Sequence, residues 1–316
     1  MSERSPELIG WDLLRGALTT RAYAIVAELR VAHALVDGPR PVDEVARAVG
    51  ADPDVLHRLL RALASDGVFA EQERGVFANT PASERLLEDG ETAFAHLFGG
   101  VFHRTAGALE ADGKPSFAEV YGTDFWAWLE SNPSERSAFD TAMGGRKDRT
   151  ADRLATVGWR GDETVVDVGG GNGALLVELV KRQPGLRGIV LDLPETDRDE
   201  AAFGDRVEFV AGSFFERVPE GDAYVLAGIL HDWDDESAAK ILRTIRAAAP
   251  SGARLLLVES VVPAGNEPHG AKWLDLLMLA LAAGRERDED QWRELLESEG
   301  FEPVSVTDGL VEARCP

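Results

Sequence analysis

The sequence predicts an α/β fold in which a mostly parallel sheet with helices on both faces follows a helical region. Three observations predict it. From Glu163 onward, short β-rich runs alternate with helical stretches. A glycine-rich turn, VGGGNG, joins the first of these runs to a helix. Before about residue 100, apolar residues recur at helical spacing.

The first 100 residues form the predicted helical domain. Its opening stretch, WDLLRGALTTRAYAIVAELRVAHALVDG, places apolar residues at helical spacing and ends at Gly38 and Pro39. The next segment reads as helix, tight turn and helix, with Gly50 and Pro53 at the turn. A hairpin of GVFAE and GVFANT follows. This order is that of a winged helix, a module that commonly binds DNA.

The charge of this region argues against DNA binding. The whole chain has a formal net charge of -23, and residues 1–90 hold ten Arg and no Lys against fifteen Asp and Glu. The helix that would enter the major groove carries only His57, Arg58 and Arg61, which are few positive charges for binding phosphates. We therefore expect a packing or dimerisation domain and no nucleic-acid partner.

The bulk properties indicate a globular protein of two domains, or of one large domain with an added part. The chain has 316 residues, of which 44% are hydrophobic and 28% charged. No apolar run reaches the roughly 18–20 residues that span a membrane, and the first residues lack the order of a signal peptide. Cys315 is the single cysteine, which excludes an intrachain disulfide and a thiolate metal site. We expect a cytoplasmic protein with no membrane partner.

The second predicted domain spans residues 101–316. Its first part, 101–158, is helical and aromatic, and we expect it to link the two domains and to line a pocket. The segments ETVVDVG, RGIVLDL, RVEFVAG, AYVLAGIL and RLLLVES then read as strands, with helices between most of them. In AYVLAGIL, the strand is expected to run as far as Leu230 and to present His231 at its carboxyl end.

The glycine-rich turn predicts a ligand site. Gly169, Gly171 and Gly173 have the spacing G-x-G-x-G, which differs from the dinucleotide fingerprint, and no lysine of a phosphate loop follows. The next strand ends at Asp192, where a carboxylate can accept both hydroxyls of a ribose. Asp192 could instead be a turn aspartate, since Pro194 follows it. Loop and acid together favour a nucleoside ligand.

Five motifs in order carry a resemblance to a known family. DVGGGNG, LDLP, GSFFE, LHDWDD and GRER, with the winged-helix region in front, resemble the small-molecule O-methyltransferases that use S-adenosylmethionine. That family includes plant caffeic acid and flavonoid enzymes and bacterial enzymes that tailor polyketides. The resemblance covers nearly the whole chain. It implies a Rossmann-like catalytic domain, a homodimer formed through the N-terminal domain, and a role in natural-product or antibiotic biosynthesis.

The resemblance also implies a set of cofactor-binding residues. These are Asp167, Gly169, Gly171, Gly173, Asp192, Leu193, Ser213 and Phe214. The glycines would run alongside the methionine part of the cofactor, Asp192 would bind its ribose, and Phe214 would cover its adenine. The chain departs from the family pattern at two places: Ser213 stands where relatives usually have aspartate, and Ala227 stands where plant members have lysine.

Methyl transfer to a phenol is helped by a base. A free phenol has a pKa of about 10 and histidine about 6.5, a gap worth nearly 5 kcal/mol. A neutral imidazole aimed at the hydroxyl is a suitable general base, and it needs an acceptor that orients its other nitrogen. The resemblance makes His231 this base, flanked by Glu259 and Glu286. Read alone, the two glutamates could be a solvated strand end and a helix-capping charge.

The neighbours of His231 carry weaker signals. Asp232 either touches substrate or shapes the turn, and Trp233 favours packing. Asp234 and Asp235 suit the first turn of a helix. Two methionines, Met143 and Met278, are predicted to pack on a flat aromatic substrate, although methionine also fills cores. The acidic cluster lacks a convincing ligand set, so no metal is implied.

Two further functions remain open on the sequence. A few members of this fold bind the cofactor but catalyse hydroxylation or decarboxylation, and Ser213 with Ala227 leaves that open while His231 argues against it. A DNA-binding regulator with a small-molecule sensor domain is the other, and the acidic winged helix argues against it.

Overall fold

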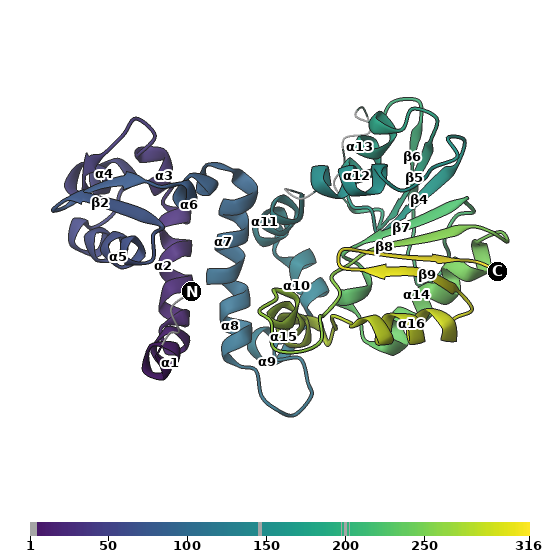
Figure 1. Cartoon of the computed structure of the whole chain (residues 1–316). Helices are drawn as coiled ribbons and strands as arrows, with labels where there is room; N and C mark the ends of the chain where they lie inside the picture. The colour runs from purple at the N-terminus through teal and green to yellow at the C-terminus, as the bar shows by residue number, and fades with distance from the viewer. Residues whose placement is uncertain (1–4, 145–146, 197, 199–200, 202) are drawn as a thin grey trace. The chain divides into compact units, whose positions relative to one another are not determined.

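The computed structural model describes residues 5–144, 147–196, 198, 201 and 203–316. The chain forms two compact units (Figure 1). The first comprises Met1–Leu109 and Glu119–Gly145, and the second comprises Glu110–Ala118 and Arg146–Pro316. In the described part of the chain, no helix combines the length and the apolarity that crossing a bilayer requires.

The first unit contains the predicted helix pair and hairpin. The helix pair is α4 (Val42–Val49) and α5 (Pro53–Ser65). Gly50 ends α4 in the left-handed region, with φ of 72°, and the Asp52 side chain accepts a 2.9 Å hydrogen bond from the Val55 amide at the start of α5. The hairpin strands, β2 (Phe69–Glu73) and β3 (Val76–Asn79), pair antiparallel. The prediction for this segment is confirmed.

The other elements of the first unit surround this motif. The three-stranded sheet has the order β1-β3-β2, and Leu56, Leu60 and Phe77 belong to the buried core beneath it. The remaining elements are α1 (Pro6–Leu14), α2 (Gly16–Glu28), α3 (Val31–Ala34), β1 (Arg40–Pro41), α6 (Pro81–Glu84), α7 (Asp89–Gly99), α8 (Val101–Gly107), α10 (Phe125–Ser131) and α11 (Pro133–Gly144). Helix α9 (Phe117–Tyr121) spans the division between the units.

A histidine joins three helices of the first unit. His96 on α7 lies with its Nδ1 3.1 Å from Glu28 Oε1 on α2, and with its Nε2 3.2 Å from Glu135 Oε2 on α11. Both ring nitrogens therefore have polar partners inside the unit. His96 has the structural role that a partnered histidine usually has.

The second unit is built on a seven-stranded sheet within the described residues. Its order is β6-β5-β4-β7-β8-β10-β9. The first five strands pair in parallel, and β10 pairs antiparallel with both β8 and β9. The strands are β4 (Thr164–Val168), β5 (Arg187–Asp192), β6 (Val207–Ala211), β7 (Ala223–Ala227), β8 (Arg254–Val258), β9 (Glu302–Thr307) and β10 (Leu310–Arg314). The prediction of a mostly parallel sheet is confirmed.

Helices cover both faces of this sheet, as Figure 1 shows. Alternate strand residues point to opposite faces, so Val165 and Val225 pack with the helices α12 and α13, whereas Val166 and Leu226 pack with α14 and α16. Burial on both sides explains the continuous apolar runs in the sequence. The helices on the two faces are α12 (Lys147–Ala155), α13 (Ala174–Arg182), α14 (Asp235–Ala248) and α16 (Glu289–Ser298); the unit also contains α15 (Ala271–Ala282).

The structure corrects one strand boundary. Strand β7 ends at Ala227 and does not continue to Leu230. Gly228 has φ of 65°, a conformation that leaves the extended path, and a single 3₁₀ turn at Leu230–Asp232 follows. His231 therefore lies inside a short turn that starts beyond the strand end.

Candidate active site

The glycine-rich loop connects the end of β4 to the start of α13. Gly169 has φ of 73°, and a Cβ added there would lie 2.7 Å from the Ile229 side chain and 3.4 Å from the Phe214 ring. A larger residue would therefore combine backbone strain with a close contact. The loop lies at the carboxyl ends of the parallel strands, where open α/β sheets bind their ligands.

Asp192 ties the second strand to this loop. One carboxylate oxygen accepts a 2.7 Å hydrogen bond from the Gly171 amide, and the other accepts bonds of 2.7 Å from the Leu193 amide and from Thr196 Oγ1. Asp192 thus has the role in the turn that the sequence left open as an alternative. A carboxylate has about four lone-pair sites, of which these bonds use three, so the oxygen bonded to Gly171 can still accept from one ribose hydroxyl.

Asp167 lies buried beneath the loop with an unpartnered oxygen. Asp167 belongs to β4, and its Oδ2 has no hydrogen-bond partner. A Cβ added at Gly170 would lie 2.6 Å from that atom. Burial raises the pKa of Asp167, Lys147 opposes this and Asp192 adds to it, and the net pKa is about 7. A buried acceptor without a partner needs an explanation, and a donor on a bound ligand would be one.

The residues after β6 lie beside the same loop. The Phe214 ring packs at 4.9 Å from the Phe215 ring, and Phe215 meets Trp233 edge to face at 4.8 Å. Trp233 therefore has the packing role that the sequence favoured. Ser213 Oγ accepts a 3.2 Å bond from the Phe215 amide, which makes it part of the local turn.

The turn that carries His231 is held by two buried glutamates. Glu259 Oε1, just beyond β8, accepts hydrogen bonds from the Ile229 amide (3.0 Å) and the Leu230 amide (2.9 Å). Glu286 Oε1 lies 2.7 Å from His231 Nδ1, whereas Glu259 Oε2 lies 3.7 Å from it. Glu286 is thus the closer orienting acceptor, and Glu259 mainly fixes the backbone of the turn.

The second ring nitrogen faces the more accessible side. His231 Nε2 lies 3.5 Å from Asp232 Oδ1, and both side chains keep some exposure while Glu259 and Glu286 are almost fully buried. When Nδ1–H donates to Glu286, Nε2 is the acceptor. This arrangement leaves one nitrogen able to take a proton from a ligand next to Asp232.

The carboxylates change the acid–base behaviour of the turn. Burial of the imidazole lowers its pKa, but Glu259, Asp232 and Glu286 together outweigh this and raise the pKa of His231 to about 10. Burial raises the pKa of Asp232 to about 7 against the opposing effect of His231. Burial likewise raises the pKa of Glu259. The surroundings therefore stabilise a protonated imidazole.

Sequence reasoning missed Arg287, which lies 1% exposed under the same turn. Its guanidinium donates to the backbone oxygens of Leu230 (3.0 Å) and Trp233 (3.2 Å) and to Asp235 Oδ1 (2.9 Å). Asp235 is therefore more than a helix-start charge, whereas Asp234 caps α14 by accepting from the Ser237 amide at 2.8 Å, as expected. The GRER motif contained Arg287, but its spacing gave no sign of burial.

The two methionines lie in different units. Met278 is buried in α15, which packs against the 3₁₀ turn of His231. Met143 lies in α11 of the first unit and is part-exposed, so its contact with substrate stays a prediction. Among the described residues, no His, Cys, Asp and Glu side chains form a group that could hold a metal ion.

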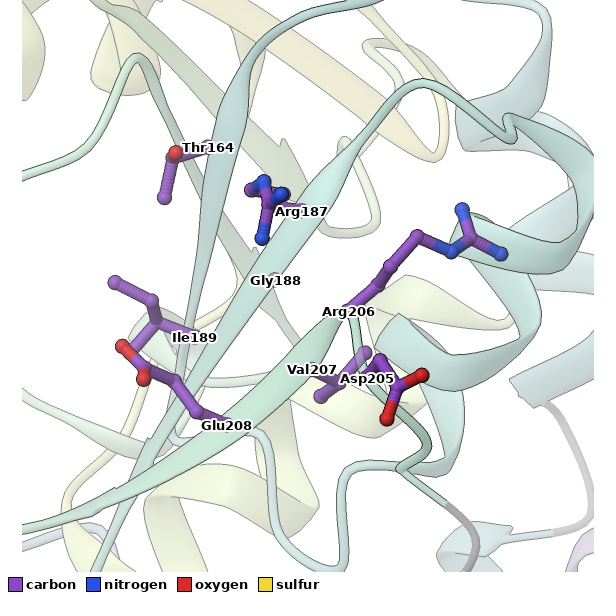
Figure 2. Close-up of a pocket in the computed structure, with 8 residues that line it drawn as sticks. All are labelled: Thr164, Arg187, Gly188, Ile189, Asp205, Arg206, Val207 and Glu208. Atoms are coloured by element: carbon purple, nitrogen blue, oxygen red, sulfur yellow. The ribbon is translucent and has the colours of Figure 1, made fainter.

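A separate hollow of about 310 Å³ lies at the amino-terminal ends of β5 and β6. Figure 2 shows Arg187 and Val207 at the first residues of these strands. The glycine loop and His231 follow the carboxyl ends of the parallel strands, where open α/β sheets bind their ligands. This hollow therefore lies at the opposite edge of the sheet from them. It carries no part of the proposed chemistry.

Comparisons with known proteins identify the family of the chain. Residues 102–302 match the O-methyltransferase domain family, and residues 11–89 match the O-methyltransferase dimerisation domain. The chain therefore belongs to the O-methyltransferase family and is an enzyme of that class.

Curated relatives and a solved structure match over most of their length. The chain is 36% identical to the phenazine O-methyltransferase of Lysobacter antibioticus, over 96% of this chain and 94% of that protein. It is 37% identical to the 3-amino-4-hydroxybenzoate 4-O-methyltransferase of Streptomyces cremeus, over 94% and 85%. A methyltransferase of neocarzinostatin biosynthesis, crystallised with S-adenosyl-L-homocysteine and 1,4-dihydroxy-2-naphthoic acid, matches with a TM-score of 0.80 at 34% identity, over 94% and 96%.

Proposed function

We propose that the enzyme methylates a phenolic hydroxyl of a small aromatic natural product with S-adenosylmethionine, and that His231 is the general base. The hydrogen-bond distance of 2.7 Å between His231 Nδ1 and buried Glu286 is the observation that carries this proposal. Relatives named for phenazine, hydroxybenzoate and naphthoate substrates support an aromatic acceptor.

The residues around the glycine loop fit this cofactor. Asp192 would accept from a ribose hydroxyl, Phe214 would cover the adenine, and Asp167 would receive a donor from the methionine part. The bound cofactor supplies an activated methyl group on a positively charged sulfur. What the protein supplies is position, because the acceptor oxygen must lie in line with the departing sulfur.

The carboxylates around His231 strengthen it as a base. In water, moving a proton from a phenol to histidine is unfavourable by about 3.5 pKa units. Raising the pKa of His231 to about 10 brings base and phenol close to balance. Glu286 would hold the ring so that Nε2 receives the proton, and Asp232 would stabilise the resulting charge.

One experiment tests the proposed activity. Purified protein is incubated with S-adenosylmethionine and a panel of phenols, catechols and hydroxynaphthoates, and products are analysed by mass. We expect a gain of one methyl and an equal amount of S-adenosylhomocysteine. Conversion of a substrate by hydroxylation or decarboxylation, with no methyl gained, would support the non-methylating alternative instead.

The pH dependence of turnover should report the charge on His231. Because the base must be neutral to accept a proton and its pKa is raised to about 10, kcat/KM is expected to keep rising with pH from 6.5 to about 10. Glu286→Gln removes a negative neighbour and should move the apparent pKa down toward 6.5. Initial rates from pH 6 to pH 10 give both profiles. Profiles that superimpose would contradict the role of Glu286.

We also propose a homodimer formed through the N-terminal domain. Three apolar side chains at the start of this domain are largely exposed: Trp11 (61%), Leu14 (80%) and Leu18 (75%). Burying such a patch in a second copy would remove it from water. The cytoplasmic location expected from the sequence remains a prediction.

Sedimentation can test the dimer. We expect the wild type to sediment as a dimer, and the double variant Leu14→Asp with Leu18→Asp to sediment as a monomer. Val304→Asp, which places the same charge at a half-exposed apolar position on β9, is the matched control and should stay dimeric. A dimeric double variant would place the interface elsewhere.

A further inference from the structure

The chain segment that carries Glu286 lies directly against the turn of His231. A Cβ added at Gly284 would overlap the backbone oxygen of His231, so only glycine fits there. The next amide, that of Arg285, donates a 2.8 Å hydrogen bond to the same His231 oxygen. The Glu286 carboxylate follows, 2.7 Å from His231 Nδ1. The backbone and a side chain of this segment thus bind the same histidine.

The end of α15 leads the chain into this position. Ala283 has φ of 57°, a left-handed conformation that is unfavourable for a residue with a side chain. The Gly284 amide donates to the Met278 oxygen at 3.1 Å, which closes the end of the helix. Helix ends usually place glycine at the left-handed residue itself. Here glycine is required one residue later by the contact with His231, and the strained conformation falls on Ala283.

One polar side chain of α15 fixes the backbone of Glu286. Asp275 Oδ1 accepts a 2.9 Å hydrogen bond from the Glu286 amide. Asp275 is the only polar residue between Leu274 and Ala282, and aspartate is a poor helix former. Its presence in an apolar helix therefore calls for a contact outside the helix. The bond to Glu286 is such a contact, and it comes from a helix that packs against the turn of His231.

We propose that Asp275 is a positioning residue for the base, which holds the Glu286 carboxylate at His231 Nδ1 by binding the Glu286 amide. This inference rests on the proposed role of His231 and extends it to a residue that does not touch the imidazole. Without the Asp275 oxygen, the amide of a buried residue loses its acceptor, and the backbone that carries the carboxylate can shift. The ring would then be held less firmly in line with the substrate hydroxyl.

The pKa of His231 is a direct readout of this role, and nuclear magnetic resonance of protein with isotope-labelled histidine measures it. The imidazole faces the carboxylates of Asp232, Glu259 and Glu286, and Asp275 acts on the last of these alone. In Asp275→Ala we expect a lower pKa of His231, because the Glu286 carboxylate moves away from the ring. We also expect kcat to fall roughly tenfold, with KM changed less than about twofold.

Two conservative variants separate the hydrogen bond from the charge. Asp275→Asn keeps an acceptor oxygen without the charge, and it should keep the pKa of His231 and most of kcat. Asp275→Glu keeps the charge but moves the acceptor by one methylene group, and it should lower both quantities. The reverse pattern would overturn the proposal, because the charge of Asp275 would then matter and its position would not. Both variants remain informative if Asp275→Ala does not fold.

Combining two substitutions tests whether Asp275 acts through Glu286. In a Glu286→Gln background there is no carboxylate charge left to displace, so adding Asp275→Ala should shift the pKa of His231 much less than it does in the wild type. Equal shifts in the two backgrounds would show that Asp275 acts by another route and would overturn the proposal.

Asp288→Ala is the matched control. Asp288 Oδ1 accepts a 2.9 Å hydrogen bond from the Gln291 amide at the start of α16, so this variant removes a bond of the same kind two residues beyond Glu286. It should leave the pKa of His231 and kcat unchanged. An unchanged pKa of His231 in Asp275→Ala, or an equal shift in Asp288→Ala, would overturn the role of Asp275. The titration needs no turnover, so a wild type without methyl transfer would overturn the proposed function separately.

Discussion

Replacing His231 by alanine is expected to lower kcat for methyl transfer by about 10²- to 10⁴-fold, the usual contribution of a positioned general base. The affinity for S-adenosylmethionine should stay within a factor of about two, because none of the residues proposed to hold the cofactor contacts the imidazole. Steady-state rates on a phenolic substrate, together with titration of the cofactor, measure both quantities. A low kcat with unchanged cofactor affinity would show that the base is lost while the cofactor site is intact.

The control for this substitution is His269→Ala. His269 lies in the same unit, is partly exposed and contacts Asp308 at 3.5 Å, so this variant should keep the wild-type rate. Substrates of lower phenol pKa provide a second check, because they need less help from a base. The loss in His231→Ala should therefore shrink along a series of increasingly acidic phenols. A loss that is the same for every phenol would contradict the proton-transfer role and indicate a positioning effect.

The glycine loop and the end of the second strand were predictable because their chemistry is local. The motif VGGGNG requires a tight turn, and Asp192 stands at the end of the apolar run Ile189–Leu191. The same holds for Asp234, whose place before a helical pattern predicts a cap that the structure confirms. The hairpin of β9 and β10 was also readable, since Asp308 and Gly309 mark its turn, but it was not predicted.

Long-range pairings could not be read in this way. Glu259 and Glu286 come from segments far apart in the sequence. Their different roles, one fixing the turn and the other orienting the ring, depend on their distances to His231 Nδ1. Lys147 reaches the loop because α12 packs beside α13, a contact without a sequence signature. Arg287 reads as one more surface charge in an acidic protein, and its burial follows from tertiary packing alone.

That burial makes Arg287→Met a sharp test of how the turn is held. The methionine has similar length and fits an apolar site, so the main losses are hydrogen bonds to the backbone oxygens of Leu230 and Trp233 and the bond to Asp235. Leaving buried acceptors unsatisfied should lower the free energy of unfolding by about 2–4 kcal/mol. Chemical denaturation with urea measures this change.

Arg285→Met is the matched control, because Arg285 binds the other oxygen of Asp235 from a half-exposed position. Its loss should cost less than about 1 kcal/mol, as exposed ion pairs do. Arg287→Met should also lower kcat more than it raises KM, because the turn whose backbone it binds carries His231, while Arg287→Lys should restore part of the stability. If both methionine variants lost equal stability, Asp235 pairing would explain the effect, and the contacts of Arg287 with the backbone of the turn would contribute nothing measurable.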